Sequence, residues 1–340
     1  MQKPSPWRLC VAPMLDWTDK HCRVLHRLLT RRARLYTEMV TTGALLHGGP
    51  EIERRLLRHD AVERPLALQL GGSEPADLAR CAAIGQRWGY DEINLNCGCP
   101  SDRVQRGAFG ACLMLRPSLV ADGVKAMVDT VDVPVTVKHR IGIGREESYA
   151  FVRDFVGTVA QAGCGVFIVH ARNAWLEGLS PKENREIPPL RHEVAYRLKR
   201  DFPGLSIVLN GGVGDDARIA AHLMHVDGVM VGRAAYHQPW WLSGWDEKFL
   251  GGEPCSRTPD EVEAEMVAYM QREAHEDGTP WSAIARHMLG LHHGRRGARL
   301  WRQVWSDHRL KPLPPEQVGA RARACLKPAS VQQEAGFEAV

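Results

Sequence analysis

Residues 165–171 are GVFIVHA, an apolar run that begins with a glycine and ends in a histidine just before Ala171. No polar position alternates with the apolar ones, which is typical of a strand covered on both faces in a parallel sheet. Comparable runs occur along the first two thirds of the chain: RLCVAPM (8–14), RLYTEMV (34–40), PLALQL (65–70), EINLNC (92–97), PVTVKHR (134–140), SIVLNGG (206–212) and GVMVGR (228–233). Together they predict eight buried strands.

Segments with helical spacing separate these runs. Val24, Leu25 and Leu29, for example, follow Thr18, which we expect to be the N-cap of a helix. Eight strand–helix units fit a (β/α)8 TIM barrel better than an open doubly wound sheet, which has fewer strands and usually a glycine-rich first turn. The predicted fold class is α/β, with the barrel in residues 1–250.

The rest of the chain has a different pattern. GGEPCSRTP (251–259) is a Gly/Pro-containing linker, and residues 260–327 carry helical patterns that predict a small all-α domain. Residues 328–340 have the composition of a disordered tail.

Charge is segregated in this last part. Residues 251–280 carry 2 Lys/Arg against 8 Asp/Glu, whereas residues 281–327 carry 10 against 2. A basic helical face is most often only solvated. The absence of acidic residues from 278 to 306 nevertheless favours an anionic partner such as RNA.

The totals exclude several classes of protein. With 340 residues and 44% hydrophobic composition the chain can bury a sizeable core, and no apolar run approaches the roughly 18 residues of a membrane helix. The N-terminus lacks a signal-peptide core, so we expect a cytoplasmic protein without membrane contact. The nine cysteines include no pair at zinc-ribbon spacing, so neither structural disulfides nor a metal are expected.

A barrel of this class carries its chemistry at the carboxyl ends of its strands. The candidate side chains at those ends are Met14, Asp16, Glu38, Gln69, Asn96, Cys99, Lys138, His139, Arg140, His170, Arg172, Asn210 and Arg233.

Two glycine turns end the last two predicted strands. LNGGV (209–213) and VGRAAY (231–236) can offer backbone N–H groups to a phosphate, with Arg233 beside them. The alternative is that both are ordinary glycine turns.

Gln69, Lys138 and His170 end three other strands. An amide suits the edge of a flavin ring, and cations suit the negative charge that the ring gains on reduction. A lone Lys or His near a strand end is more often structural, so the hypothesis of a bound flavin mononucleotide (FMN) depends on the convergence of these groups with the glycine turns.

Two cysteines flank Gly98 where the run EINLNC meets a loop. Cys99 opens the loop before Pro100, and an unperturbed thiol is largely protonated at neutral pH, so it can act as a general acid. Cys97 lies at the strand end, where free cysteine packs like a small apolar filler. We expect Cys99 to be catalytic and Cys97 to be structural.

Two further segments have the character of binding elements. The loop ARNAWLEGLSPKENREIPPL (171–190) is long for a connection of this kind, and long loops on a catalytic face are commonly lids or binding elements. Arg299 and Arg302 lie three residues apart on one helical face and are the candidates for contact with RNA.

These motifs resemble the tRNA-dihydrouridine synthases and fit the A-type bacterial branch closely. The resemblance spans residues 8 to about 310 and is most specific in LNCGCPS (95–101) and SPKENREIPPL (180–190). Further matching segments are APMLDWTDKHCR, YTEMV, ALQLGGS, VTVKHRIG, LNGG and VMVGRAAY.

The resemblance implies a flavin-dependent oxidoreductase that reduces the 5,6 double bond of uridine in the D-loop of tRNA. Position 20 is the implied target, position 20a stays open, and NADPH is the implied electron donor. In the implied mechanism a hydride from reduced FMN reaches C6 of the uracil, and Cys99 protonates C5.

The resemblance also implies site residues. FMN contacts fall on Pro13, Met14, Leu15, Gln69, Lys138, His170, Asn210, Gly211, Gly212, Gly232 and Arg233. Asn96 is the implied substrate contact, and Lys182, Arg185, Arg299 and Arg302 are the implied tRNA contacts. We expect a monomer, although the sequence leaves the oligomeric state open.

Two other functions stay open on sequence alone. A flavin barrel could reduce a small pyrimidine or enone and use the helical tail only to oligomerise. Alternatively, the chain could be a non-catalytic RNA-binding barrel. The first predicts that free uracil reacts as fast as tRNA, and the second predicts a colourless protein that is indifferent to Cys99→Ala.

Overall fold

A computed structural model describes residues 5–101, 104, 107–145 and 148–326. Its eight strands form one sheet of parallel neighbours in the order β1-β8-β7-β6-β5-β4-β3-β2. The strands are β1 Leu9–Val11, β2 Leu35–Thr41, β3 Leu66–Gly71, β4 Glu92–Cys97, β5 Val135–Arg140, β6 Val166–His170, β7 Ser206–Asn210 and β8 Gly228–Val231. Each of the eight predicted runs corresponds to one strand, and β2 and β3 extend one residue beyond their runs.

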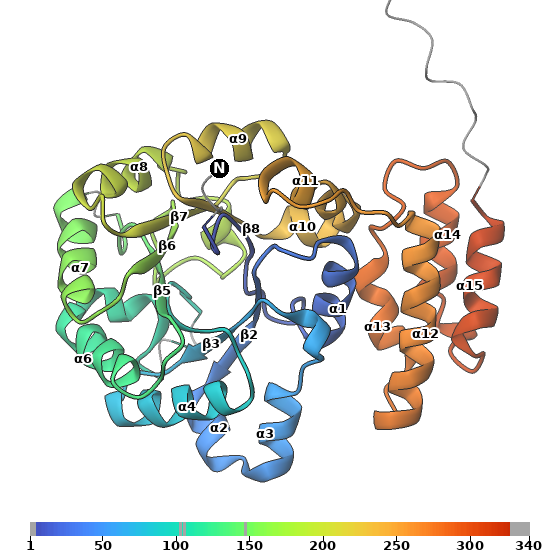
Figure 1. The fold of residues 1–340 in the computed structure, drawn as a ribbon, viewed down its shortest axis with the longest axis horizontal. Helices are drawn as coiled ribbons and strands as arrows, with labels where there is room; N and C mark the ends of the chain where they lie inside the picture. Colours follow the sequence, from blue (N-terminus) through green and yellow to red (C-terminus); the bar gives the residue numbers. More distant parts are fainter. Residues whose placement is uncertain (1–4, 102–103, 105–106, 146–147, 327–340) are drawn as a thin grey trace, which may run out of the picture.

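The sheet closes where β1 meets β2. Cys10 and Arg34 form an isolated parallel bridge, and Val11 N donates to Arg34 O over 2.9 Å. Helices surround the closed ring of strands (Figure 1). The predicted (β/α)8 barrel is confirmed.

The helices follow the predicted alternation. Those around the barrel are α1 Lys20–Leu29, α2 Thr42–His47, α3 Gly49–Leu57, α4 Pro75–Arg87, α6 Pro117–Val128, α7 Tyr149–Gln161, α8 His192–Asp201, α9 Asp216–Leu223, α10 Arg233–His237 and α11 Trp245–Phe249. The C-terminal helices are α12 Pro259–Asp277, α13 Trp281–Met288, α14 Ala298–Trp305 and α15 Pro315–Ala324. The 3-10 helices are η1 Ala61–Glu63, η2 Gly110–Leu115, η3 Glu183–Arg185, η4 Pro239–Gly244 and η5 His308–Leu310.

Alternate residues of each strand face the barrel interior. The apolar members of this inner set form a cluster of their own, apart from the large core between strands and helices: Cys10, Ala12, Tyr36, Ala67, Val166, Ile168, Val208 and Met230. Strand side chains alternate between the two faces with a period of two. This set therefore shows which of the remaining strand residues point into the barrel and which point toward the helices.

The N-cap of α1 differs from the prediction. Asp19, not Thr18, caps the helix, and its carboxylate accepts from the backbone N–H groups of His21 and Cys22 over 3.0 Å each. Thr18 instead closes the turn after β1, because its hydroxyl accepts from Met14 N over 2.9 Å. Both residues are good caps, and the path of the chain after β1 decides which one begins the helix.

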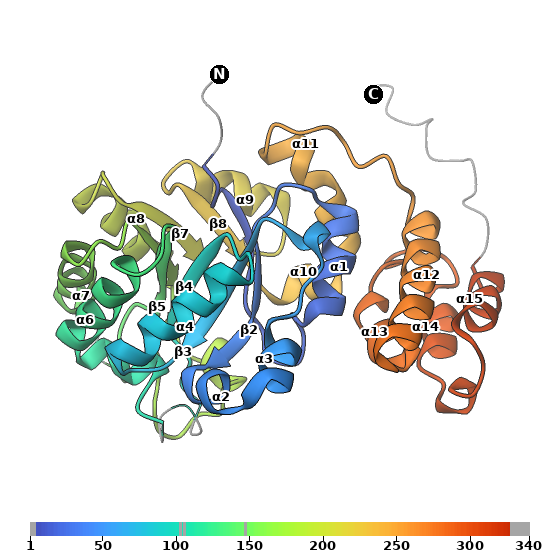
Figure 2. The ribbon, with the colours of Figure 1, turned by 60° about the horizontal axis from the view of Figure 1, so that its bottom comes forward.

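Helices α12 to α15 lie beside the barrel, and α12 and α13 pack on α1 (Figure 2). Helix α12 begins at a capping box formed by Thr258 and Glu261, at the end of the predicted linker 251–259. The division into a domain at 1–250 and another at 260–327 stays a prediction. Residues 328–340 lie outside the described part of the chain.

Ion pairs join the acidic end of α12 to the barrel. They are Lys20–Asp277 and Arg54–Asp277 at 3.2 Å each, Arg58–Glu276 at 2.9 Å, and Lys20–Glu273. The barrel therefore neutralises part of the acidic segment 251–280. In the basic segment 281–327, Arg286 pairs with Asp19 of the barrel at 2.9 Å.

Among the described helices, none combines the length and the apolar character needed to cross a bilayer.

Candidate active site

Five predicted site residues face inward at the carboxyl ends of neighbouring strands. They are Gln69, Asn96, Lys138, His170 and Asn210. Asn96 lies in register with Lys138, and His170 with Asn210, so these side chains meet on the inner face of the barrel.

The same alternation turns His139 outward. Its ring packs against Phe155 and Phe167, with ring centres 5.2 and 5.8 Å away, and it is fully buried. The expectation that His139 belongs to the mouth of the barrel is wrong. His139 lies between the inward residues Lys138 and Arg140, so the alternation of the strand points its side chain the other way.

Gln69 lies in a chain of amides inside the barrel. Its Nε2 donates to Asn94 Oδ1 over 2.7 Å, and its Oε1 accepts from Asn96 Nδ2 over 2.9 Å. A primary amide has two donor hydrogens and two acceptor lone pairs, so one of each stays available to a ligand. Gln69 is thus held in one orientation and can still pair with the edge of a ring.

Asn96 shapes the turn that carries Cys99. Its Oδ1 accepts from Gly98 N and Cys99 N over 3.0 Å each, which curls the backbone around the amide. Sequence reasoning assigned Asn96 only to the substrate and missed this role. The pattern Asn-x-Gly-x after a strand could have indicated it, since Asn commonly accepts from backbone N–H groups two residues on.

Gly110 supports the same turn from the other side. Ala111 N donates to Cys99 O over 2.9 Å, and Gly110 has a φ of +75°. A Cβ on Gly110 would lie 2.7 Å from Cys99 O, so a larger residue would displace the cysteine. The Cys99 side chain is half-buried, with Sγ 3.5 Å from Ser101 Oγ.

Cys97 faces away from the mouth. It is fully buried in the core between strands and helices, and burial, with smaller contributions from Cys164 and Cys112, raises the pKa of its thiol. The prediction that Cys97 is a structural filler is confirmed.

Burial governs the two basic groups beside the amides. It lowers the pKa of Lys138 to about 7, and Arg140 adds to this effect. It also lowers the pKa of His170 well below its ordinary value, with Arg140 and Lys138 adding to the effect. His170 is therefore neutral at pH 7 here, whereas the sequence hypothesis expected a cation; a bound anion would raise both pKa values.

The first glycine turn has no room for side chains on its two glycines. Gly211 and Gly212 have φ values of +115° and +74°. A Cβ would lie 2.9 Å from Cδ2 of His170 at Gly211, and 2.4 Å from Cδ1 of Leu190 at Gly212. Asn210 Nδ2 donates to Met230 O over 2.8 Å and ties this turn to β8.

Two residues that sequence reasoning missed hold this turn. His192 Nε2 lies 2.8 Å from Gly211 O, and Arg218 donates to Gly212 O over 2.9 Å. No short motif marks either residue, because His192 reaches the turn from α8, which precedes β7, and Arg218 reaches it from α9, which follows.

The second glycine turn lies next to the turn after β1. A Cβ on Gly232 would lie 3.8 Å from Met14 Sδ, so the two turns are neighbours. Arg233 forms an ion pair with Glu186 at 2.6 Å. The structure thus brings Met14, Gly232 and Arg233 to one side of the mouth, close to the loop after β6.

The turn after β1 has its own support. Asp16 has a φ of +62°, and its N–H donates to Glu38 Oε1 over 2.5 Å. Pro13 is half-buried, and Leu15 is 71% exposed, so its side chain is free to meet a ligand.

The loop after β6 is anchored by a buried arginine. Arg140, 3% exposed, donates to Gly98 O over 3.1 Å, to Asn184 O over 2.9 Å and to Asn173 O over 3.3 Å. One guanidinium therefore holds both the Cys99 turn and the long loop. Lys182 and Arg185, on the same loop, are exposed.

Arg299 and Arg302 lie away from the mouth. Both are on α14, where Arg299 is exposed and Arg302 is half-buried. Within the described residues, neither forms a hydrogen bond or an ion pair with the barrel.

One cluster in the helical part was not anticipated. Ligand atoms of Asp260, Glu263 and His292 lie within 4.8 Å of one another, a spacing at which a metal ion could bind. The carboxylate of Glu263 already accepts from the indole N–H groups of Trp301 and Trp305 over 3.1 Å each. Through these hydrogen bonds the buried polar cluster joins the helices that pack around it.

Comparison with known proteins defines the class. The chain matches the family model of dihydrouridine synthase (Dus) over residues 10–320. It therefore belongs to the dihydrouridine synthase family, which the inward polar groups, the Cys99 turn and the barrel had indicated.

Curated relatives lie close to the chain over nearly their whole length. It is 58% identical over 327 residues to a tRNA-dihydrouridine(20/20a) synthase from Pseudomonas putida, covering 96% of each chain. It is 55% identical over 306 residues to the protein of the same name from Escherichia coli O6:H1, covering 90% of this chain and 91% of that one.

A solved structure supports the fold alone. A 2-naphthoyl-CoA reductase complex superposes with a TM-score of 0.55 at 10% identity, covering 71% of this chain and 50% of that chain.

Proposed function

We propose that this chain reduces uridine to 5,6-dihydrouridine in the D-loop of tRNA, at positions 20 and 20a. The main support is that Cys99 lies at the barrel mouth, on a turn built by Asn96 and Gly110. The chain that carries it is 58% identical to a tRNA-dihydrouridine(20/20a) synthase. The reaction adds two hydrogens to a carbon–carbon double bond, so it needs a hydride source and a proton source.

FMN fits the residues that face the mouth. Gln69 keeps a donor and an acceptor free, Lys138 and His170 are positioned to gain charge beside an anion, and the Gly211–Gly212 turn, with positive φ at both glycines, can offer backbone N–H groups to a phosphate. Bound there, FMN would supply a hydride to the substrate after reduction by NADPH. Further contacts would come from Pro13, Met14, Leu15, Asn210, Gly232 and Arg233.

Cys99 supplies the proton. Its Sγ would donate a proton to C5 of the uracil, while C6 accepts the hydride. The thiolate left behind is reprotonated from solvent, so the enzyme returns to its starting state. Asn96 Nδ2 has a second hydrogen beside the one given to Gln69, and it would bind a uracil carbonyl.

The tRNA would be held by its phosphates. Lys182 and Arg185 lie on the loop beside the mouth, and Arg299 and Arg302 lie on the helical part. A base in folded tRNA must leave its stack to reach a barrel mouth, and phosphate contacts at a distance can hold the rest of the molecule meanwhile. We place this reaction in the cytoplasm and assign it to a monomer.

The test uses unmodified tRNA and NADPH, with mass spectrometry of the digested RNA for a uridine that gains two hydrogens. We expect the gain in the D-loop with the wild-type protein, and a loss of about 100-fold or more in rate with Cys99→Ala, since general-acid catalysis contributes roughly 10²–10⁴-fold. Flavin reduction by NADPH should be unchanged in this variant.

Cys97→Ala is the matched control, because it removes a thiol two residues away on the outward face. It should retain dihydrouridine formation. Equal loss in both variants would contradict the assignment of the acid, and a gain on free uracil as fast as on tRNA would contradict the substrate.

A further inference from the structure

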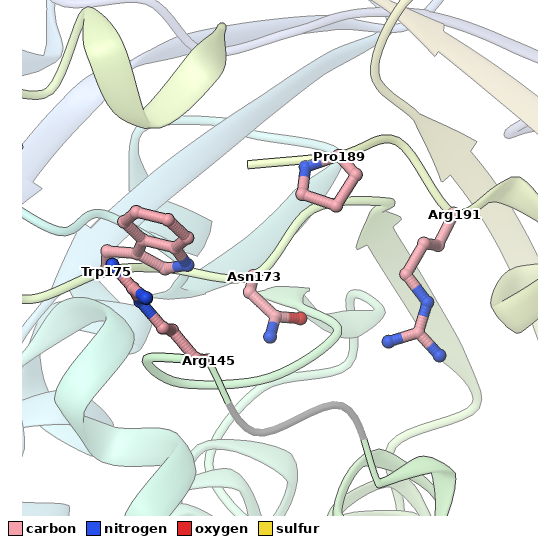
Figure 3. A pocket seen from close by; sticks show the side chains of 5 residues that line it. All are labelled: Arg145, Asn173, Trp175, Pro189 and Arg191. Carbon is pink, nitrogen blue, oxygen red and sulfur yellow. The ribbon is translucent and has the colours of Figure 1, made fainter. Parts of the chain in front are cut away.

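A small pocket lies beside the long loop after β6. It is lined by Arg145, Asn173, Trp175, Pro189 and Arg191, and its volume is about 240 Å³. In Figure 3 the rings of Trp175 and Pro189 lie on either side of Asn173, with Arg191 beyond Pro189. Pockets for drug-sized ligands are typically about 300–1,000 Å³, so this one suits a single planar group.

The two loops that carry Arg145, Asn173 and Trp175 are joined by a continuation of the sheet. Beyond the ends of β5 and β6, Ile143 and Ala174 form a parallel bridge. Gly144 N donates to Ala174 O over 2.7 Å, and Ala174 N donates to Gly142 O over 2.9 Å. Ladder hydrogen bonds therefore tie the two loops together before any ligand arrives.

Asn184 fixes the aromatic wall. It is fully buried, its Oδ1 accepts from Trp175 N over 2.8 Å, and its Nδ2 donates to Trp175 O over 2.9 Å. Arg140, which holds Asn184 O, also holds Gly98 O. The position of Trp175 is thus coupled through two buried side chains to the turn that carries Cys99.

The chemistry of the wall suits a nucleotide. The Arg145 guanidinium lies 5.0 Å from the centre of the Trp175 ring system, and Arg191 lies at the N-cap of α8, 3.4 Å from Glu193 Oε1. An aromatic face flanked by arginines binds bases by stacking and phosphates by charge. The positive end of the α8 dipole adds to this attraction.

We propose that this pocket binds one nucleotide of the tRNA other than the target uridine, with its base against Trp175 and its phosphate toward Arg145 and Arg191. The proposal rests on the proposed function, because it assigns the substrate of that site a second anchor. NADPH carries the same chemistry, a base and phosphates, but Lys182 and Arg185 on the same exposed loop favour the RNA.

The experiment compares Trp175→Ala, Trp175→Phe and Arg145→Ala with the wild type. Three quantities are measured on the flavin-loaded protein: the Kd for unmodified tRNA without reductant, the kinetics of dihydrouridine formation, and the rate of flavin reduction at subsaturating NADPH. We expect Trp175→Ala to raise the Kd and KM for tRNA about 10-fold, as loss of one base–aromatic stack does. Trp175→Phe should restore most of the affinity.

Arg197→Ala is the matched control. Its guanidinium lies 3.8 Å from the centre of the Tyr149 ring on the outer helices α7 and α8, so it removes the same charge and the same kind of contact outside the pocket. This variant should bind tRNA as the wild type does.

The outcomes separate the possible ligands. Slower flavin reduction with unchanged tRNA binding would assign the pocket to NADPH and overturn the proposal. Wild-type tRNA binding and kinetics in both Trp175→Ala and Arg145→Ala would also overturn it. A wild-type protein that binds tRNA but makes no dihydrouridine would contradict the proposed function instead, since the binding arm needs no turnover.

Discussion

Lys138 links a single side chain to the pH dependence of stability. Its pKa of about 7 in the folded protein, lowered by burial and by Arg140, lies below the value of about 10 in an unfolded chain. Between pH 7 and 10 the unfolded chain therefore binds more protons than the folded one, so the contribution of Lys138 to stability rises with pH in this window. Below pH 7 the cost of burying the cation is fully present.

We therefore expect Lys138→Met to stabilise the flavin-free protein by ~2–4 kcal/mol at pH 6, since one pKa unit corresponds to about 1.4 kcal/mol. The gain should shrink as the pH rises from 7 to 10. Urea unfolding at several pH values measures it. Lys125→Met, at an exposed position paired with Asp129, is the control and should show no such trend; a gain from Lys138→Met that is constant with pH would contradict the lowered pKa.

At the scale of the element, the start of α1 has two functions. Asp19 caps the helix, and the same carboxylate accepts from Arg286 over 2.9 Å and lies 3.0 Å from His287 Nε2, both on α13. Burial alone would raise the pKa of Asp19, but the hydrogen bond and charge of His287 outweigh it and lower the pKa. The residue that caps this barrel helix thus also helps to hold the helical part of the protein against the barrel.

The two functions can be separated by substitution. Asp19→Asn keeps a good cap and loses the charge, whereas Asp19→Ala loses both. We expect Asp19→Ala to lower the free energy of unfolding by ~1 kcal/mol more than Asp19→Asn does, measured in urea. Asp215, which caps α9 by accepting from Arg218 N, has no partner on the helical part among its described hydrogen bonds and ion pairs. Asp215→Asn should leave the free energy of unfolding nearly unchanged. If Asp19→Asn also left it unchanged, the proposed role of Asp19 in holding the helical part would be contradicted.

At the scale of the whole molecule, charge divides between two surfaces. The acidic end of α12 is paired with Lys20, Arg54 and Arg58 of the barrel, so the basic α14 dominates what the helical part offers to a polyanion. Phosphate contacts give a binding constant that falls with salt, by a slope of about 0.9 for each phosphate neutralised on a duplex.

Arg299→Ala combined with Arg302→Ala should therefore weaken tRNA binding and reduce the salt slope by about 1–2, without changing flavin reduction by NADPH. Titrations of tRNA binding at several salt concentrations measure the slope. Arg80→Ala with Arg153→Ala removes the same charge from exposed positions on the outer helices α4 and α7, and should leave the slope nearly unchanged. Equal slopes in both double variants would exclude contact through α14.

The sequence by itself determined the strands. A short apolar run that is bounded by turns and alternates with helical segments is stable as a buried strand of a parallel sheet. It also indicated Gln69, Lys138 and His170 as polar groups at strand ends, although the same pattern included His139, which the alternation of the strand turns outward. Cys97 and Cys99 differ because the strand ends at Cys97, whereas Cys99 lies in the loop before Pro100.

Only the tertiary structure decided which side chains form hydrogen bonds with one another. Whether Thr18 or Asp19 caps α1 depends on the path of the turn after β1 and on α13, which lies some 270 residues away in the chain. The hold of Arg140 on Gly98 and Asn184, and that of His192 on Gly211, join segments far apart in sequence. Hydrogen bonds of this kind are specified by distance and direction in space, and a linear pattern carries neither.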